Sequence, residues 1–392
     1  MWFLVYSATG SRALESVNPL NYGGSLRKSE PKPNIVKEFN VSVFAHSEYD
    51  NHEQVVFCRD AASGLYAIIA VHDTTLGPAA GGCRMWPYPT FEDALTDALR
   101  LSRAMSYKNA LAGLALGGGK SVIIGDPHHD KNEKLLAAFA GHVQRLGGTY
   151  HTAEDVGIGL EDVEVLAKHS DYVFGVASKG VSTGDPSPST ARGVFAGIRA
   201  AAKHKLGRDT LDGLKVAVQG VGNVGLNLCK HLREAGAELV VSDVNEEAIG
   251  RAIEACDVRA VSPQEIYGQE VDVFAPCALG GILDDDTIPQ LKAVIISGGA
   301  NNQLAEPRHG QVLADRGILY APDYVVNAGG MLNASGDIFQ VYDVEQVMER
   351  VDSIYDTALK IFQIAEAEGR PTHEVADELA REKIAAGKNS GG

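Results

Sequence analysis

The sequence predicts an α/β protein of two domains with a cleft between them, and three observations carry that prediction. The chain has 392 residues, of which 45% are hydrophobic, so it can form two buried cores. Its second half alternates β-rich apolar runs with helical patterns, which is typical of a parallel sheet with helices on both faces. Its first half begins with two adjacent β-rich runs, which indicate an antiparallel hairpin.

The expected boundaries follow from these patterns. Residues 1–37, which include "SLRKSEPKPN", are expected to form a flexible N-terminal arm. Residues 38–183 form the first α/β domain and residues 184–354 form the second. The helical segment 355–392 is expected to return and pack on the first domain.

The first domain starts with the hairpin and a helix. The hairpin is expected in "QVVFCRDAASGLYAIIAV", residues 54–71, with its turn at "ASG". In the next helix, Thr90 and Asp93 have the spacing of a capping box. Lys108 then lies at the end of this helix, twelve residues before Lys120.

The stretch "LALGGGKSVIIGD" contains Lys120 and resembles a phosphate-binding loop at first sight. Such a loop needs a glycine five positions before Gly119, and Leu114 occupies that place. The loop should also follow a strand and open a helix, whereas "SVIIGD" after Lys120 is β-rich. The sequence therefore favours a glycine turn that presents Lys120 for another purpose.

The second domain repeats strand and helix in order. Helices are expected at 191–206, 224–235 and 344–369, and strands in "LKVAVQG", "ELVVSD", "VDVFAP" and "AVIISGG".

The turn after "LKVAVQG" carries the pattern G-x-G-x-x-G at Gly220, Gly222 and Gly225. It follows a strand, opens a helix and is followed about 20 residues later by Asp243, which together form the fingerprint of a Rossmann dinucleotide-binding domain. The helix N-terminus is expected to receive the pyrophosphate. Asp243 would bind the ribose hydroxyls and repel a 2′-phosphate, so NAD is expected rather than NADP.

The composition argues against several classes of binding partner. The formal charge of −16, from 51 acidic and 35 basic residues, argues against nucleic acid. No run approaches membrane length, and "MWFLVYSATG" lacks the features of a signal peptide. The five cysteines show neither disulfide nor metal-ligand spacing, so no metal site is expected and the protein is expected to be cytoplasmic.

Several motifs together resemble the glutamate/leucine/phenylalanine/valine dehydrogenase family, and the leucine branch most. They are "GPAAGGCR", "SYKNA", "GGGKS", "TAEDVG", "GDPSPSTARGVF", "FAPCALGG", "GGANNQL" and "LYAPDYVVNAGG". The resemblance runs from about residue 52 to the C-terminal helix. It implies reversible, NAD-dependent oxidative deamination of an L-amino acid to a 2-oxo acid and ammonia. It also implies that the first domain binds substrate and makes a homo-oligomer, an octamer or a dimer.

The resemblance assigns roles to individual residues. Lys120 and Asp155 would be catalytic, Lys108 would bind the substrate carboxylate, and the backbone of Gly81 and Gly82 would hold the α-substituents. Asn301 would contact both substrate and cofactor. The substrate side chain would meet Ala80, Ala153, Met331 and Ala334. The cofactor would contact Thr190, Asn223, Val224, Cys277, Ala278 and Asn327 in addition to the glycine motif.

These roles are also chemically reasonable. Hydrolysis of an imine needs a general base for water, and a lysine serves if burial and a neighbouring cation such as Lys108 lower its pKa. A carboxylate such as Asp155 can then pass the proton between Lys120 and the substrate nitrogen.

The expected substrate is leucine or another branched-chain amino acid, and phenylalanine is the alternative. Ala80 enlarges the pocket, since leucine-type members commonly have leucine there, whereas Met331 makes it smaller. Two other functions compete with this one. The chain could be an NAD-sensing binding protein, or a 2-hydroxy acid dehydrogenase that uses His151.

Overall fold

We describe residues 42–176 and 185–390 of a computed structural model. The predicted arm, 1–37, and the predicted domain boundary at 183/184 lie outside these residues. The chain divides into the units 1–46 and 47–392. The described part of the first unit contains the short 3-10 helix η2, Val43–Ala45.

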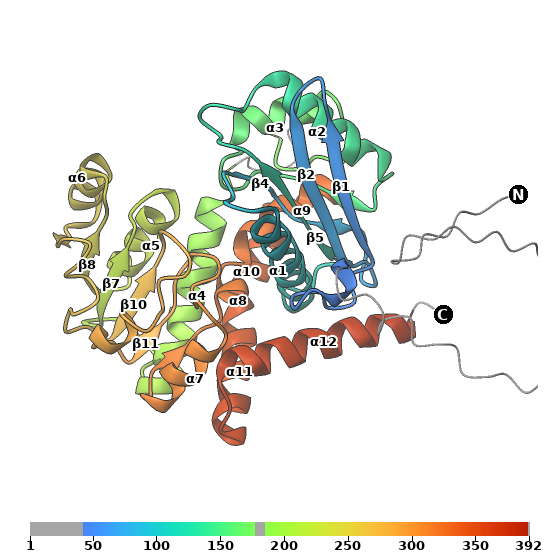
Figure 1. The fold of residues 1–392 in the computed structure, drawn as a ribbon. Helices are drawn as coiled ribbons and strands as arrows, with labels where there is room; N and C mark the ends of the chain where they lie inside the picture. The colour runs from blue at the N-terminus through green and yellow to red at the C-terminus, as the bar shows by residue number, and fades with distance from the viewer. Residues whose placement is uncertain (1–41, 177–184, 391–392) are drawn as a thin grey trace, which may run out of the picture. The chain divides into compact units, whose positions relative to one another are not determined.

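The second unit contains two separate sheets, and the first has a mixed topology (Figure 1). Its strand order is β1-β2-β5-β3-β6, with β4 also paired to β5. The strands are β1 Gln54–Asp60, β2 Leu65–Asp73, β3 Ala79–Ala80, β4 Cys83–Trp86, β5 Gly117–Ile124 and β6 Tyr150–His151. The predicted hairpin is confirmed, because β1 and β2 pair antiparallel; β3 and β4 run parallel to β5.

Helices cover both faces of this sheet. Helix α1, Phe91–Leu111, packs against β2 and β5, and the predicted capping box of Thr90 and Asp93 opens it. Helices α2, Glu133–Arg145, and α3, Leu160–Ala167, build the other core. There Phe139 packs with Ile123 and Met85.

The predicted glycine turn before Lys120 is wrong, because Gly117, Gly118 and Gly119 are the first residues of β5. A Cβ on Gly118 would overlap the backbone nitrogen of Ser106 in α1, and one on Gly119 would press into the Tyr150 ring. These glycines therefore allow close packing of helix and ring on the strand rather than a change of direction.

The second sheet is parallel throughout, in the order β12-β11-β10-β7-β8-β9. Its strands are β7 Lys215–Gln219, β8 Glu238–Ser242, β9 Arg259–Ala260, β10 Val273–Pro276, β11 Ile295–Ile296 and β12 Leu319–Tyr320. Its helical segments are α4 Ser187–Leu206, α5 Asn223–Glu234, α6 Glu246–Cys256, η4 Ile288–Gln290 and α7 Arg308–Asp315. The predicted α/β class with a Rossmann domain is confirmed.

The C-terminal part is a series of helices. The series is α8 Asp323–Val326, α9 Gly329–Phe339, α10 Val344–Asp352, α11 Ile354–Glu368 and α12 Thr372–Ser390. The helical segment expected at 344–369 is confirmed as two helices, α10 and α11, that meet at Ser353. Ser353 ends α10, and Gly369, in the left-handed conformation, ends α11.

Helix α12 leaves the second domain and packs on α1 of the first (Figure 1). Ile384 of α12 lies in the same buried cluster as Tyr107 and Leu111 of α1, and this cluster continues into the core of the Rossmann sheet. No helix among the described residues is long and apolar enough to cross a membrane.

Candidate active site

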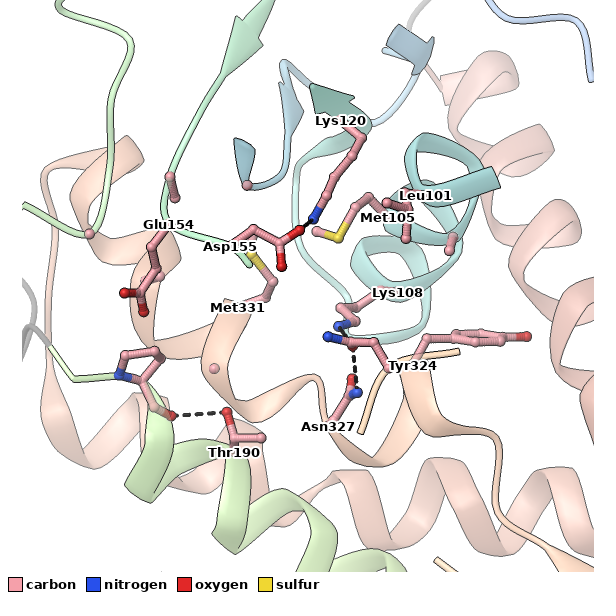
Figure 2. Close-up of a pocket in the computed structure, with 18 of the residues that line it drawn as sticks. Leu101, Met105, Lys108, Lys120, Glu154, Asp155, Thr190, Tyr324, Asn327 and Met331 are labelled. Carbon is pink, nitrogen blue, oxygen red and sulfur yellow. Dashed lines mark hydrogen bonds and ion pairs between the residues drawn. The ribbon is translucent and has the colours of Figure 1, made fainter. Parts of the chain in front are cut away.

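A cavity of about 280 Å³ opens between the two sheets. It is lined by α1, by β5, by the loop after β6, and by the first turns of α4 and α9. Eleven of the predicted residues line it (Figure 2): Gly82, Lys108, Lys120, Ala153, Asp155, Thr190, Val224, Asn301, Asn327, Met331 and Ala334.

Lys120 and Asp155 form a buried ion pair at one side of this cavity. The Lys120 ammonium contacts Oδ2 of Asp155, and Figure 2 shows the two side chains meeting tip to tip. Lys120 is 7% exposed. Burial by itself would raise the pKa of Asp155, but Lys120 and Arg84 outweigh it and hold this pKa below its usual value.

Arg84 comes from the neighbouring strand. Arg84 of β4 is paired with Val122 of β5, two residues beyond Lys120. Side chains two residues apart on a strand lie on one face, so Arg84 and Lys120 both face α1. The Arg84 Nε lies 3.5 Å from Asp155 Oδ2, and its Nη1 donates to Asp97 Oδ2 of α1 at 2.9 Å.

Lys108 is the second cation of the cavity. It lies in the last turn of α1, where its Nζ donates to Oδ1 of Asn301 in the other domain at 3.3 Å. Asn327 Nδ2 donates to the same oxygen at 2.8 Å. Burial lowers the pKa of Lys108 to about 8, against the opposing effect of Asp323. A partner that is an amide and not a carboxylate leaves the Lys108 charge available to an anion.

Much of the cavity lining is apolar. Ala153, Met331 and Ala334 line the cavity together with Leu101, Met105 and Phe174.

Two predicted contacts are placed elsewhere. Ala80 is fully buried in the apolar cluster that contains Ala153, and it is not among the residues that line the cavity. Ala80 belongs to the short strand β3, between β5 and β6, and its side chain is packed among Leu116, Phe174 and the other residues of this cluster. Gly81 is also buried behind the lining, whereas the adjacent Gly82 reaches it.

The glycine turn after β7 has the shape that a dinucleotide needs. Gly220 has φ +90°, and a Cβ on Gly225 would overlap the carbonyl oxygen of Gly220. A Cβ on Gly222 would meet nothing within 4 Å, so this residue leaves open space at the N-terminus of α5. The three glycines thus supply the turn, the open approach and the close packing of the fingerprint.

Other residues that the sequence predicts at the cofactor surround this turn. Asp243 follows β8, and its carboxylate accepts the amide of Val221 at 2.7 Å. Cys277 and Ala278 follow β10, and a Cβ on Gly220 would touch Ala278. Asn223, the first residue of α5, lies beside Val224, which lines the cavity. The open space at the N-terminus of α5 and the nearby carboxylate of Asp243 therefore fit a dinucleotide.

Thr190 joins the cofactor side of the cavity to its substrate side. Its hydroxyl donates to the carbonyl oxygen of Pro186 at 3.0 Å (Figure 2). A Cβ on Gly330 would meet this hydroxyl, and one on Gly329 would overlap the backbone of Ser189. The first turns of α4 and α9 are thus in backbone contact.

Sequence reasoning missed several residues that line the cavity. Arg84, Glu154, Phe174, Asp323 and Tyr324 were assigned no role. Arg84 and Glu154 stand inside the quoted motifs "GPAAGGCR" and "TAEDVG", so a signal existed for these two. No histidine lines the cavity in the part of the chain that the structure describes, and His151 instead packs against the Tyr172 ring.

Comparison with known proteins decides the family. The Glu/Leu/Phe/Val dehydrogenase dimerisation domain matches residues 52–179, and the glutamate/leucine/phenylalanine/valine dehydrogenase domain matches 182–252 and 241–392. The chain belongs to the glutamate/leucine/phenylalanine/valine dehydrogenase family. It is therefore an oxidoreductase with a nicotinamide dinucleotide cofactor.

Similar members of this family act on different amino acids, by their names. The leucine dehydrogenase of Geobacillus stearothermophilus is 54% identical over 344 residues, which are 88% of this chain and 94% of that one. The valine dehydrogenase of Streptomyces virginiae is 49% identical over 342 residues, 86% of this chain and 95% of that one. The crystal structure of L-tryptophan dehydrogenase from Nostoc punctiforme matches with a TM-score of 0.74 and 47% identity, and covers 86% of this chain and 97% of that chain.

Proposed function

We propose that this amino acid dehydrogenase oxidises branched-chain L-amino acids, with leucine preferred, and releases the 2-oxo acid and ammonia reversibly. One observation carries the proposal. The Lys120–Asp155 pair and the cation of Lys108 line the same cavity as an apolar wall. An L-amino acid with an apolar side chain has a carboxylate that complements Lys108, an amino group that complements the Lys120–Asp155 pair, and a side chain that complements the apolar wall.

Lys108 binds the substrate carboxylate in this proposal. Its side chain has an amide partner, Asn301, so an incoming carboxylate gains an ion pair without displacing another anion. The carboxylate also favours the charged form of Lys108, whose pKa burial lowers to about 8.

Lys120 and Asp155 handle protons. The bound nicotinamide supplies a hydride acceptor for the substrate α-carbon. Water then attacks the resulting imine carbon, and Lys120, as a free amine, takes the proton of that water. Asp155 receives the proton from Lys120 and delivers it to the leaving nitrogen, since its Oδ2 already contacts the Lys120 Nζ.

The cavity walls support an apolar substrate. Ala153 and Ala334 leave space, and Met331 and Phe174 add apolar surface. Apart from Arg84, Lys108 and Lys120, the residues that line the cavity include no cation that could hold an acidic side chain. Relatives named as leucine and valine dehydrogenases support a branched-chain substrate. A relative named as an L-tryptophan dehydrogenase keeps phenylalanine and other aromatic amino acids as the alternative.

NAD is the proposed cofactor rather than NADP. The Asp243 carboxylate lies beside the glycine turn, where it would accept hydrogen bonds from ribose hydroxyls and repel a 2′-phosphate. We further propose a homo-oligomer, an octamer or a dimer, because residues 52–179 match a dimerisation domain. A cytoplasmic location is part of the same proposal.

A spectrophotometric assay tests the proposal. NADH formation is followed with a panel of L-amino acids and 2-hydroxy acids, with NAD and NADP in parallel. We expect the highest kcat/KM for leucine or another branched-chain substrate with NAD. A higher kcat/KM for phenylalanine or tryptophan would establish the alternative, and turnover of a 2-hydroxy acid alone would contradict amino acid deamination.

A further inference from the structure

We infer that Arg84 is a positioning residue for catalysis. Asp97 and Tyr88 hold its guanidinium in place, and Arg84 in turn keeps the Asp155 carboxylate ionised and in contact with Lys120. This inference rests on the proposed function.

The four charged groups form one alternating chain. From the cavity outward, Lys120 contacts Asp155, Asp155 faces Arg84, and Arg84 donates to Asp97. The charges alternate in sign and sum to zero. Side-chain exposure is 9% for Lys120, 11% for Asp155, 18% for Arg84 and 24% for Asp97, so the pairs interact with little solvent screening.

Arg84 is anchored at its outer end. Its Nη1 donates to Asp97 Oδ2 at 2.9 Å, and the Tyr88 hydroxyl donates to the same oxygen at 2.5 Å. Three separate elements thus meet at this point: β4 carries Arg84, α1 carries Asp97, and the connection between them carries Tyr88. An anchored guanidinium can direct a neighbour, whereas a free one would adapt to it.

The inner end of Arg84 points at Asp155 without a completed hydrogen bond. The Arg84 Nε is a buried atom with no hydrogen-bond partner, and it lies 3.5 Å from the same Asp155 Oδ2 that Lys120 contacts. Two complementary buried atoms at this separation form a hydrogen bond after a small movement of the carboxylate. Arg84 therefore offers a second partner when Lys120 changes its protonation state.

That second partner has a defined use in the reaction. Lys120 must lose its proton to act as a base, and at that moment Asp155 loses its cationic neighbour. Arg84 cannot lose its own proton, so it keeps one positive charge beside Asp155 throughout the cycle. Asp155 consequently stays ionised in the resting enzyme, ready to accept a proton at each turnover.

Other groups also face Asp155 and set the background. They are Lys108, Glu154, Tyr88, Cys83, Tyr150 and the backbone amide of Val156. Lys108 favours the charged carboxylate, Glu154 opposes it, and none of these replaces the anchored cation of Arg84.

The experiment measures kcat/KM for L-leucine with saturating NAD as a function of pH. In Arg84→Met, loss of the cation raises the pKa of Asp155. The acid side of the pH profile, or acid limb, should therefore move to higher pH by about one unit. Arg84→Lys keeps the charge and should leave the limb near the wild-type position. Asp97→Asn removes the negative charge beside Arg84, so the cation of Arg84 acts more strongly on Asp155. The acid limb of this variant should therefore move to lower pH.

The control is Arg308→Met, which breaks an Arg–Asp pair with Asp285 on the far domain and should leave the profile unchanged. If Arg84→Met fails to fold, Arg84→Lys and Asp97→Asn decide the matter. The inference alone is overturned if the wild-type enzyme oxidises leucine but the acid limb stays in place in all folded variants. In that case the rates of the variants would fall equally at every pH. A wild-type chain that oxidises no L-amino acid overturns the proposed function itself.

Discussion

Lys120 and Lys108 line one cavity but have opposite kinds of partner. Lys120 is paired with a carboxylate, whereas Lys108 meets the amide oxygen of Asn301. A lysine whose neighbour can receive its proton is equipped for proton transfer, and a lysine with a neutral neighbour is equipped to hold an anion. The two substitutions below separate these roles.

Replacing Lys120 by alanine should lower kcat by about 100-fold or more, because the general base for water is lost. Affinity for NAD, measured by fluorescence titration, should change little, since the glycine turn lies elsewhere. Lys203→Ala provides the control, because it removes an exposed lysine that pairs with Asp209. Near-normal turnover in Lys120→Ala would return this residue to a purely structural role.

Replacing Lys108 by alanine should mainly raise the KM for the amino acid. The ion pair with the substrate carboxylate exists in the ground state and the transition state alike, so its loss weakens both equally. Steady-state kinetics with saturating NAD give the two parameters. A fall in kcat at unchanged KM would contradict the assignment.

The sequence motifs single out candidate residues, but they do not show which other residues surround them. Lys108, Lys120 and Asp155 stand inside recognisable motifs, and the structure brings them to one cavity. Arg84 also stands in a motif, but its contact with Asp155 arises from the β4–β5 register and cannot be read from local sequence. The motif predicts Ala80 at the substrate, whereas the structure buries it in an apolar cluster behind the cavity lining.

At the scale of elements, the β7–turn–α5 unit and the end of β8 form the cofactor cradle. Asp243 is held there by the amides of Val221 and Asn245 at 2.7 and 2.9 Å. The carboxylate is therefore fixed before any ligand arrives.

Asp243→Ser should reduce the preference for NAD over NADP. Removal of the negative charge ends its repulsion of a 2′-phosphate, so the ratio of kcat/KM for the two cofactors should fall by about tenfold or more. The comparison variant is Glu254→Gln, an exposed acid on α6. An unchanged ratio in Asp243→Ser would mean that another residue excludes NADP.

Two buried histidines tie β2 and the segment before β1 to α1. His52 Nε2 lies 3.0 Å from the Ser102 hydroxyl, and His72 Nδ1 lies 2.7 Å from that of Ser106. Burial, together with repulsion from His52, lowers the pKa of His72 to about 4 from 6.5. The neutral ring thus stabilises the fold above about pH 6.5, and this contribution is lost as the pH falls toward 4.

His72→Gln should therefore weaken the acid sensitivity of the fold. In wild type, His72 alone should lower the free energy of unfolding by about 2 kcal/mol between pH 7 and pH 5. Urea unfolding at both pH values, at one protein concentration, measures this loss. His129→Gln, in which an 80% exposed side chain is replaced, should keep the wild-type difference. Equal differences in His72→Gln and wild type would contradict the prediction.

Local signals predicted some elements and misled for others. The capping box at Thr90 and Asp93 fixed the start of α1, because both partners lie within one turn. The glycines 117–119 were taken for a turn, because their reason, the close approach of α1 and Tyr150, comes from residues distant in sequence.

At the scale of the molecule, α12 connects the two domains. Its buried residues Val375, Ala376 and Ile384 belong to the cluster that also contains Tyr107 and Leu111 of α1. Lys383 adds hydrogen bonds to the carbonyl oxygens at the end of α1. Length and strand–helix alternation predicted two domains, but which helix bridges them depends on packing, which the sequence leaves open.

Ile384→Ala should destabilise the fold by about 2 to 5 kcal/mol, the usual cost of a cavity at a buried isoleucine. Urea unfolding gives this value. Glu382→Ala, on the exposed side of the same helix, should have little effect. If Ile384→Ala were as stable as wild type, the packing of α12 on α1 would contribute little to the fold.

The backbone contact between α4 and α9 has a consequence for how substrate preference can evolve. Gly329 and Gly330 lock the start of α9 against Ser189 and Thr190, and the side chains of Met331 and Ala334, which follow in the same helix, line the cavity. The start of the helix is thus fixed by glycines, whereas the size of the cavity depends on the side chains of Met331 and Ala334. Mutation can resize the pocket for another amino acid while the glycine pair keeps the nicotinamide side in place, so one scaffold can diversify without being rebuilt.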